Sequence, residues 1–224
     1  MKKPLAELIG TYLLVFLGTS AVVTALTLTG GKLQPQAVLA IGLTFGMSLV
    51  AIAYAFGPIS GAHVNPAVTL GMVMAGKMPI GEAVGYWVAQ FMGGILASVT
   101  VMAALGESAR EFHFGANAPG SFGVGAAVAF EVVSTMLFFL VIYGAAASKR
   151  AAGGFAGISI GLYLAASHLA GIPISGSSLN PARDLGPAVV SGGEVLAGVW
   201  VYFAGPLAGA ALGGLLARFV HEGD

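Results

Sequence analysis

The chain has 224 residues, of which 57% are hydrophobic and only 8% are charged. A soluble domain carries about a quarter charged residues, so this composition predicts an integral membrane protein. Nine basic residues balance nine acidic ones, which gives no indication of a nucleic-acid partner, and the absence of cysteine excludes disulfides, thiolate catalysis and cysteine-bound metals.

Charged residues divide the apolar sequence into six predicted spans, because an ionised side chain at the bilayer centre is costly. The apolar run after Lys2 and Lys3 resembles a signal peptide. It is nevertheless long enough to cross a membrane, which takes about 20 residues, and it has a later copy in the chain. We therefore place spans at 5–29, 36–57, 81–104, 122–147, 155–172 and 194–219.

Two uncharged stretches, 33–76 and 151–182, are too long for one span and too short for two spans with a turn. Asparagine is a favoured helix N-cap and proline a favoured first helical residue, so an Asn-Pro-Ala motif predicts the start of a short half-helix that dips into the membrane. Each stretch contains one such motif: Asn65, Pro66 and Ala67 in the first, and Asn180, Pro181 and Ala182 in the second.

The two halves of the sequence correspond to each other. Glu7-Leu-Ile-Gly-Thr11 matches Glu131-Val-Val-Ser-Thr135, and the two asparagines occupy equivalent places. Three spans per half is an odd number, so the second copy enters the membrane from the opposite side. We predict one transmembrane domain over 1–224, an all-α membrane protein whose six helices and two re-entrant half-helices form an inverted 3+3 repeat, with copies at 1–110 and 122–224.

Lysine and arginine in the short loops indicate the orientation, because they accumulate on the cytoplasmic side. With both termini cytoplasmic, six of these residues lie inside and two outside. The loop over 106–121 is then external, and we assign it no chemistry. The six inside are Lys2, Lys3, Lys77, Lys149, Arg150 and Arg218, and the two outside are Lys32 and Arg110.

Non-helical backbone at membrane depth is tolerated where it is buried in protein or lines a wet cavity. We expect the dipping segments, 60–64 and 174–179, to expose carbonyls along a file of water that faces an apolar wall. Each half-helix N-terminus carries roughly half a positive charge and so repels cations. The amide nitrogens of Asn65 and Asn180 are expected to donate toward the lumen, while Glu7 and Glu131 brace the loops, with a proton relay as the alternative role for these two carboxylates.

Arg183 follows Asn180 by three residues, and an arginine in such apolar sequence is a functional candidate. Its alternative role is to fix the carbonyls of the second dipping segment. The equivalent position in the first half is Val68, so a constriction at this level is expected on one side only.

These paired motifs, the paired glutamates and the inverted repeat resemble the aquaporin (major intrinsic protein) family over essentially the whole chain. Resemblance to its bacterial water-selective members implies a homotetramer of one-pore subunits. It also implies a selectivity filter made of the arginine, a phenylalanine of the second helix, a histidine of the fifth and a small residue before the second motif. The matching residues here are Arg183, Phe45, His168 and Ser177.

Asp184 departs from the water-channel pattern, because glycerol facilitators of this family carry aspartate there. Ala188 and the Tyr202-Phe203 pair depart from the glycerol pattern instead. We expect a passive channel for water that excludes protons and ions, with a facilitator of glycerol or another small neutral solute as the alternative and an ion-coupled transporter as a different class. We expect no enzymatic activity, cofactor or metal; the short tails favour a prokaryotic inner membrane.

Overall fold

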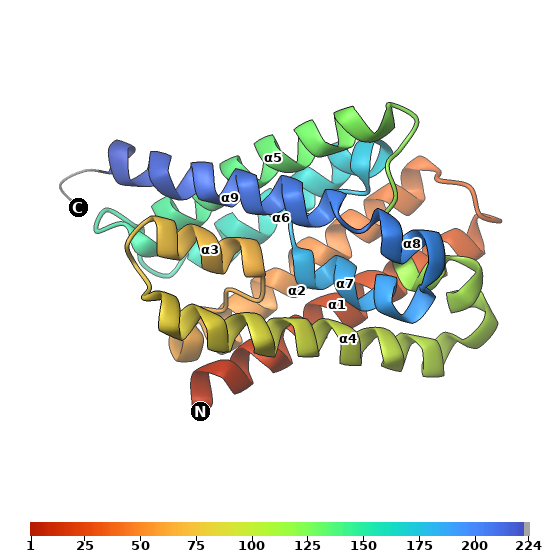
Figure 1. Cartoon of the computed structure of the whole chain (residues 1–224), viewed down its shortest axis with the longest axis horizontal. Helices are drawn as coiled ribbons and strands as arrows, with labels where there is room; N and C mark the ends of the chain where they lie inside the picture. Colours follow the sequence, from red (N-terminus) through yellow and green to blue (C-terminus); the bar gives the residue numbers. More distant parts are fainter. Residues whose placement is uncertain (222–224) are drawn as a thin grey trace.

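The structure is a computed structural model that describes residues 1–221 of the 224. Its ordered elements in those residues are helices (Figure 1). They are α1 (Lys2–Leu28), α2 (Pro35–Ser60), α3 (Pro66–Met74), α4 (Ile80–Glu111), a 3₁₀ turn η1 (His113–Gly115), α5 (Gly123–Ile142), a π turn η2 (Tyr143–Ala147), α6 (Ala156–Ser175), α7 (Pro181–Ser191), α8 (Gly193–Gly198) and α9 (Val201–Val220).

Six segments of the described chain are long and apolar enough to cross a membrane, which confirms the predicted number of spans. They are α1, α2, α4, α5 with η2, α6, and α8 with α9. The helices α3 and α7 have 9 and 11 residues and are too short to cross. The beginning of α1 and the end of α9 lie at one end of the bundle, called the terminal face below, and the other end is called the opposite face (Figure 1).

Several predicted boundaries were wrong. The second and fifth spans were ended at the residues before Pro58 and Pro173, yet α2 and α6 continue through these prolines to Ser60 and Ser175. The helices end instead at glycine, where Gly61 and Gly176 adopt left-handed conformations with φ of 89° and 84°. Such a C-terminal glycine is a stronger stop than a proline one turn earlier.

The external loop is also more ordered than predicted. Helix α4 reaches Glu111, well past the predicted end at 104, and its direction changes at Gly106, whose φ of 51° is not helical. A short 3₁₀ turn follows at His113–Gly115.

The packing exchanges elements between the two halves of the chain. Helix α1 packs against α2 and α4, and α5 packs against α6 and α9. The half-helix α3 lies against α9 of the second half, while α7 lies against α4 of the first. Each half-helix is therefore held by a long helix from the other half, and the two meet inside the bundle (Figure 1).

Small residues let the long helices approach closely, as their spacing predicts. A Cβ on Gly209 of α9 would lie 2.2 Å from the carbonyl oxygen of Val132 in α5. A Cβ on Gly161 of α6 would lie 2.6 Å from the carbonyl oxygen of Gly46 in α2. These contacts require glycine at both places and make the bundle compact around its interior.

Candidate functional site

The first half-helix begins at Asn65, whose side-chain oxygen caps α3. This Oδ1 accepts from the backbone N–H of Ala67 at 2.8 Å and of Val68 at 3.4 Å, and Pro66 is the first helical residue. A helix start otherwise leaves such N–H groups without partners. The geometry follows what the motif predicts.

The second half-helix begins in the same way at Asn180. Its Oδ1 accepts from the backbone N–H of Ala182 at 3.0 Å and of Arg183 at 3.4 Å, and Pro181 occupies the first helical position of α7. The positive ends of α3 and α7 thus face each other in the interior.

The two asparagines also tie the half-helices to each other. Asn65 Nδ2 donates to the carbonyl oxygen of Leu179 at 2.7 Å, and Asn180 Nδ2 donates to that of Val64 at 2.9 Å. A carboxamide has two N–H groups, so one N–H of each asparagine remains for the lumen. The predicted donation toward the lumen can therefore use only one N–H group of each asparagine.

Glu7 holds the first dipping segment from α1. Its buried carboxylate accepts from Ser60 Oγ at 2.7 Å and from the backbone N–H groups of His63 at 2.9 Å and Val64 at 2.6 Å. Gln90 of α4 donates to the same carboxylate at 2.8 Å.

Glu131 holds the second dipping segment from α5 with matching contacts. Its buried carboxylate accepts from Ser175 Oγ at 2.7 Å and from the backbone N–H groups of Ser178 and Leu179, both at 2.8 Å. Val64 and Leu179 have φ of 43° and 57°. These left-handed backbone conformations cost energy for residues with bulky side chains. The carboxylates bond directly to these strained residues.

Two tyrosines that sequence reasoning left without a role complete the loops. Tyr86 OH donates to the Ser60 carbonyl at 2.7 Å, and Tyr202 OH donates to the Ser175 carbonyl at 2.8 Å. The ends of both dipping segments are thus bound within the protein, so the stretches that can expose carbonyls are shorter than the predicted 60–64 and 174–179. A repeated Pro-Ile-Ser-Gly, at 58–61 and 173–176, is the sequence signal that marks these serines.

A narrow cavity of about 20 Å³ lies at the half-helix starts. Both asparagines line it, and much of the remaining wall is apolar, as predicted. Its lining residues are Leu14, Phe45, Leu49, His63, Val64, Asn65, Phe138, Leu164, His168, Ser178, Asn180 and Arg183.

A wide cavity of about 130 Å³ continues from it toward the terminal face. Leu49, His63 and Phe138 line both cavities, so the two cavities lie next to each other in the interior. The other lining residues of the wide cavity are Ala53, Gly61, Ala62, Val68, Met72, Ile142, Ala146 and Ile160.

Three of the four predicted filter residues meet in the narrow cavity. The rings of Phe45 and His168 stack with centroids 4.4 Å apart, and Arg183 Cζ lies 5.2 Å from the centroid of the Phe45 ring. His168 Nδ1 bonds the Leu164 carbonyl at 2.9 Å, which places its proton on Nδ1 and leaves Nε2 as an acceptor in the neutral ring.

Several polar atoms of His168 and Arg183 have no hydrogen-bond partner among the described residues. They are His168 Nε2 and the Nε and Nη1 atoms of Arg183, on side chains that are 1% and 2% exposed. An unpaired buried polar group is costly, and a small polar molecule in the cavity would relieve that cost. The arrangement can therefore bind and pass a small hydrogen-bonding solute.

Ser177, the fourth predicted filter residue, is placed differently. Its hydroxyl lies 3.1 Å from Ser167 Oγ of α6, and its side chain is fully buried outside the cavity lining. The next residue, Ser178, lines the narrow cavity instead. The left-handed φ of 57° at Ser177 turns its side chain toward α6.

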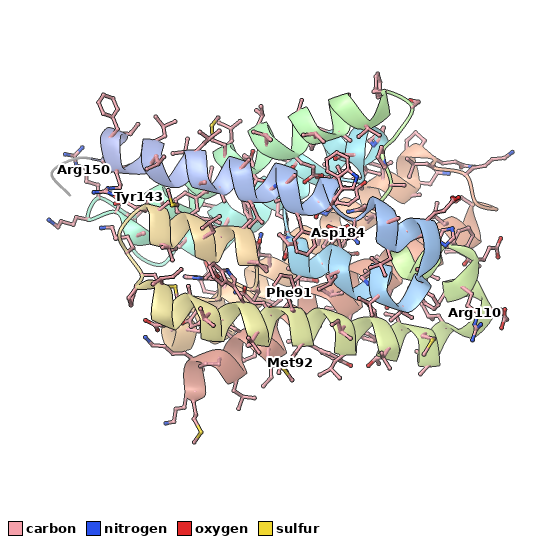
Figure 2. All side chains as sticks on the ribbon, viewed as in Figure 1. Phe91, Met92, Arg110, Tyr143, Arg150 and Asp184 are labelled. Atoms are coloured by element: carbon pink, nitrogen blue, oxygen red, sulfur yellow. The ribbon has the colours of Figure 1, made fainter. Side chains whose placement is uncertain are left out.

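Asp184 lies in the interior close to the start of α7, whereas Arg110 and Arg150 lie at the two ends of the molecule (Figure 2). It is 2% exposed, accepts a hydrogen bond from Ser178 Oγ, and its Oδ1 lies 3.7 Å from Arg183 Nη1. The first half repeats the Ser178 contact, because His63 Nδ1 lies 3.1 Å from Thr69 Oγ1 at the equivalent positions.

Asn117 is a further residue that the sequence did not single out. It comes from the external loop and lies near the Asp184 carboxylate, but its Nδ2 has no hydrogen-bond partner among the described residues. Its side-chain oxygen would lie 2.5 Å from a Cβ on Gly176, so it packs directly over the second dipping segment. The external loop thus packs over the second dipping segment.

The family model described as Major intrinsic protein matches residues 1–217. The chain belongs to the major intrinsic protein family. This confirms the resemblance seen in the sequence, and membership of a family of membrane channels also confirms that the chain is not an enzyme.

Its similar relatives in this family carry two kinds of name. Aquaporin Z of Bradyrhizobium diazoefficiens is 39% identical over 99% of this chain and 94% of the relative. Aquaporin Z of Rhodopseudomonas palustris is 40% identical over 96% and 92%. Glycerol uptake facilitator protein-like 6 of Lactiplantibacillus plantarum is 41% identical over the full length of both chains.

The aquaglyceroporin from Plasmodium falciparum shares the fold. Its crystal structure superposes with a TM-score of 0.83 over 99% of this chain and 95% of the other, at 22% sequence identity. This likeness supports the all-α architecture of six spans and two half-helices predicted from the sequence, and the chain is an integral membrane protein of the family's channel type.

Proposed function

We propose that this channel conducts water passively in single file and excludes protons and ions. The observation that carries the proposal is the narrow cavity at Phe45, His168 and Arg183. Its volume of about 20 Å³ exceeds the roughly 10–15 Å³ that one water molecule requires by only a small margin. A polyol, which is several times larger, would have to push these side chains apart.

The polar atoms of Arg183 and His168 are suited to binding water. Arg183 offers donors and His168 Nε2 offers an acceptor, so a water molecule can exchange bonds to its neighbours for bonds to the protein. The ring of Phe45 forms an apolar wall that offers nothing to the additional hydroxyls of glycerol. Ser177 supports the backbone of the second segment in this proposal and does not supply a side chain to the filter.

Charge exclusion rests on the half-helices and Arg183. Each half-helix start contributes roughly half a positive charge, and the two starts face one another. The remaining N–H groups of Asn65 and Asn180 orient a passing water so that it cannot relay a proton along the file. Glu7 and Glu131 act as braces, because their oxygens are occupied by loop donors.

A facilitator of glycerol or another small neutral solute is the alternative. Asp184 and the similarity to a glycerol uptake facilitator-like protein favour it, while the aquaporin Z relatives at nearly the same identity favour water. The narrow cavity favours water in this proposal, because Asp184 contacts Ser178 and Arg183 and does not line that cavity.

The remaining parts of the proposal follow from sequence and family. They are a homotetramer in a prokaryotic inner membrane, both termini in the cytoplasm, and one domain with repeats at 1–110 and 122–224. The bacterial relatives support the membrane assignment, and the lysines and arginines of the loops support the orientation.

Stopped-flow light scattering of proteoliposomes tests the proposed solute. Liposomes with the purified channel should shrink much faster than empty liposomes after a sucrose jump, whereas in a glycerol gradient their re-swelling should match that of empty liposomes. An internal pH dye should show no added proton leak. Glycerol entry as fast as water exit would contradict the proposal and establish the facilitator.

A further inference from the structure

The ring of Phe45 rests in a space that exists because residue 18 of α1 is glycine. Gly18 is buried, and a Cβ on it would lie 2.1, 2.2 and 2.7 Å from three carbons of the Phe45 ring. Real Cβ contacts essentially never fall below 3.0 Å, so any side chain at this position must displace the ring.

The same side of α1 contributes to the cavity wall one turn earlier. Leu14 lines the narrow cavity, and residues four apart on a helix lie on one side of it. At the level of Gly18 the helix supplies no side chain, and the ring of Phe45 from α2 occupies that place. Gly18 and Phe45 thus fill one layer of the cavity wall together.

Phe45 cannot move freely in the other direction. Its ring stacks on His168 with a centroid separation of 4.4 Å and lies 5.2 Å from Arg183 Cζ, and it is 1% exposed. A displacement away from Gly18 therefore presses on the partners that form the narrow cavity.

We infer that Gly18 is a positioning residue for selectivity: it sets how far the Phe45 ring projects into the lumen and hence the width of the filter. The inference rests on the proposed function, in which this ring is the filter. It assigns a role in solute choice to a residue that does not touch the solute.

The equivalent positions in the second half support the inference. With the correspondence Glu7 to Glu131, Gly18 corresponds to Ile142, and with that of Asn65 to Asn180, Phe45 corresponds to Ile160. Both isoleucines line the wide cavity with side chains of their own. The combination of glycine with an aromatic ring occurs at the narrow cavity, where the lumen must be shaped most closely.

Four channels test the coupling in proteoliposomes: wild type, Gly18→Ala, Phe45→Leu, and the double variant Gly18→Ala/Phe45→Leu. Gly125→Ala is the control for a glycine-to-alanine change in a spanning helix, because a Cβ there meets nothing within 4 Å. Water and glycerol permeability are divided by the amount of folded channel, and melting temperature is recorded for each.

We expect Gly18→Ala to lower water permeability per channel roughly fivefold or more, because the well-packed ring has no space to retreat. Gly125→Ala should match the wild type. In the Phe45→Leu background the alanine should change permeability less than twofold, since the shorter leucine leaves the space that the new Cβ needs. An equal loss in both backgrounds, or no loss in either, would overturn the inference.

The outcome is separable from that of the proposed function. If the wild type passes glycerol as fast as water, the proposed selectivity fails, and the coupling between positions 18 and 45 is then measured with glycerol. If Gly18→Ala is too unstable to reconstitute, Phe45→Leu must restore its melting temperature to that of Phe45→Leu alone; a double variant that remains unstable would contradict the contact.

Discussion

The two cavities of the lumen are built on the same supports and lined by different residues. Each lies beside a dipping segment held by a buried glutamate, a serine and a tyrosine from corresponding places. At the positions related by the repeat, however, the narrow cavity has Phe45, His168 and Arg183, whereas the wide cavity has Ile160, Ala53 and Val68. The supports and the two asparagines are duplicated, whereas the side chains at these three positions are not.

This difference separates two kinds of residue. Carboxylates and tyrosines satisfy the backbone of segments that cannot form helices at membrane depth, a requirement that both halves share. A single constriction is enough to select a solute, so the second half-lumen is free to be wide and apolar. Substitutions that make the halves more alike, or that attack the shared supports, test this separation.

The largest effect is expected when a support is removed. Glu7→Ala and Glu131→Ala should each leave at least three buried donors without an acceptor, and each such group costs about 1–3 kcal/mol. Both variants should give little folded protein in detergent, measured by size-exclusion chromatography and thermal melting.

The comparison predicts that the two halves suffer alike. A normal melting temperature for one of the two variants would show that its carboxylate is not structural and would favour a proton-relay role. Leu17→Ala, on an exposed side of α1, is the control for an alanine substitution in a spanning helix.

The next largest effect is expected when the filter is made like its counterpart. Arg183→Val copies Val68, removing both the positive charge and the bulk that closes the narrow cavity. Glycerol permeability should rise at least about tenfold, which corresponds to about 1.4 kcal/mol in the barrier, and a proton leak should appear. Light scattering and an internal pH dye measure the two effects.

The equivalent position in the first half, Val68, supplies the control. Val68→Ala changes the wide cavity at the equivalent place, where the lumen is not limiting, so both permeabilities should stay within about twofold of the wild type, or under 0.5 kcal/mol. Unchanged glycerol exclusion in Arg183→Val would remove the arginine from the filter.

His168→Ala copies Ala53 and should have an intermediate effect. It removes the acceptor Nε2 and one face of the stack with Phe45, but it leaves the positive charge of Arg183 in place. We expect glycerol permeability to rise about three- to tenfold, or roughly 0.7–1.4 kcal/mol, without a proton leak. A proton leak as large as that of Arg183→Val would show that charge exclusion at this level depends on Phe45, His168 and Arg183 together.

Much of this architecture is predictable from the sequence because membrane insertion leaves clear marks. Charges bound the spans, and an Asn-Pro-Ala motif in an overlong apolar stretch indicates a half-helix start. Arg183 is a candidate because of its place in apolar sequence, whereas Phe45 and His168 follow from the family resemblance, and the structure brings these three together.

The parts that could not be predicted depend on contacts between distant residues or on local backbone direction. Asn65 donates to a carbonyl 114 residues away, which no local pattern encodes. The hydroxyl of Ser177 turns to α6 because the residue has a left-handed φ. The presence of a serine in the sequence does not predict that conformation. The packing of Asn117 against Gly176 depends on how the external loop folds over the second segment.

The smallest effect on permeation is expected at Asp184. This is the residue that departs from the water-channel pattern of the family. Asp184→Thr copies Thr69, whose Oγ1 lies 3.1 Å from His63 Nδ1, two residues before the motif in the first half. The threonine hydroxyl can accept from Ser178 Oγ in the same way, so the segment keeps its turn. Water permeability should stay within about twofold, under 0.5 kcal/mol, and glycerol should remain excluded.

Asp184→Ala separates the structural part of this role. It leaves Ser178 Oγ with only the longer bond to the Asn180 carbonyl oxygen, at 3.2 Å, and it removes the carboxylate beside Arg183. The melting temperature should therefore fall, while Asp184→Thr stays closer to the wild type. If the wild type instead conducts glycerol and Asp184→Thr abolishes that conduction while water flow continues, the carboxylate is part of solute selection. The asymmetry between the two half-lumens would then extend from the side chains that face the solute to those behind them.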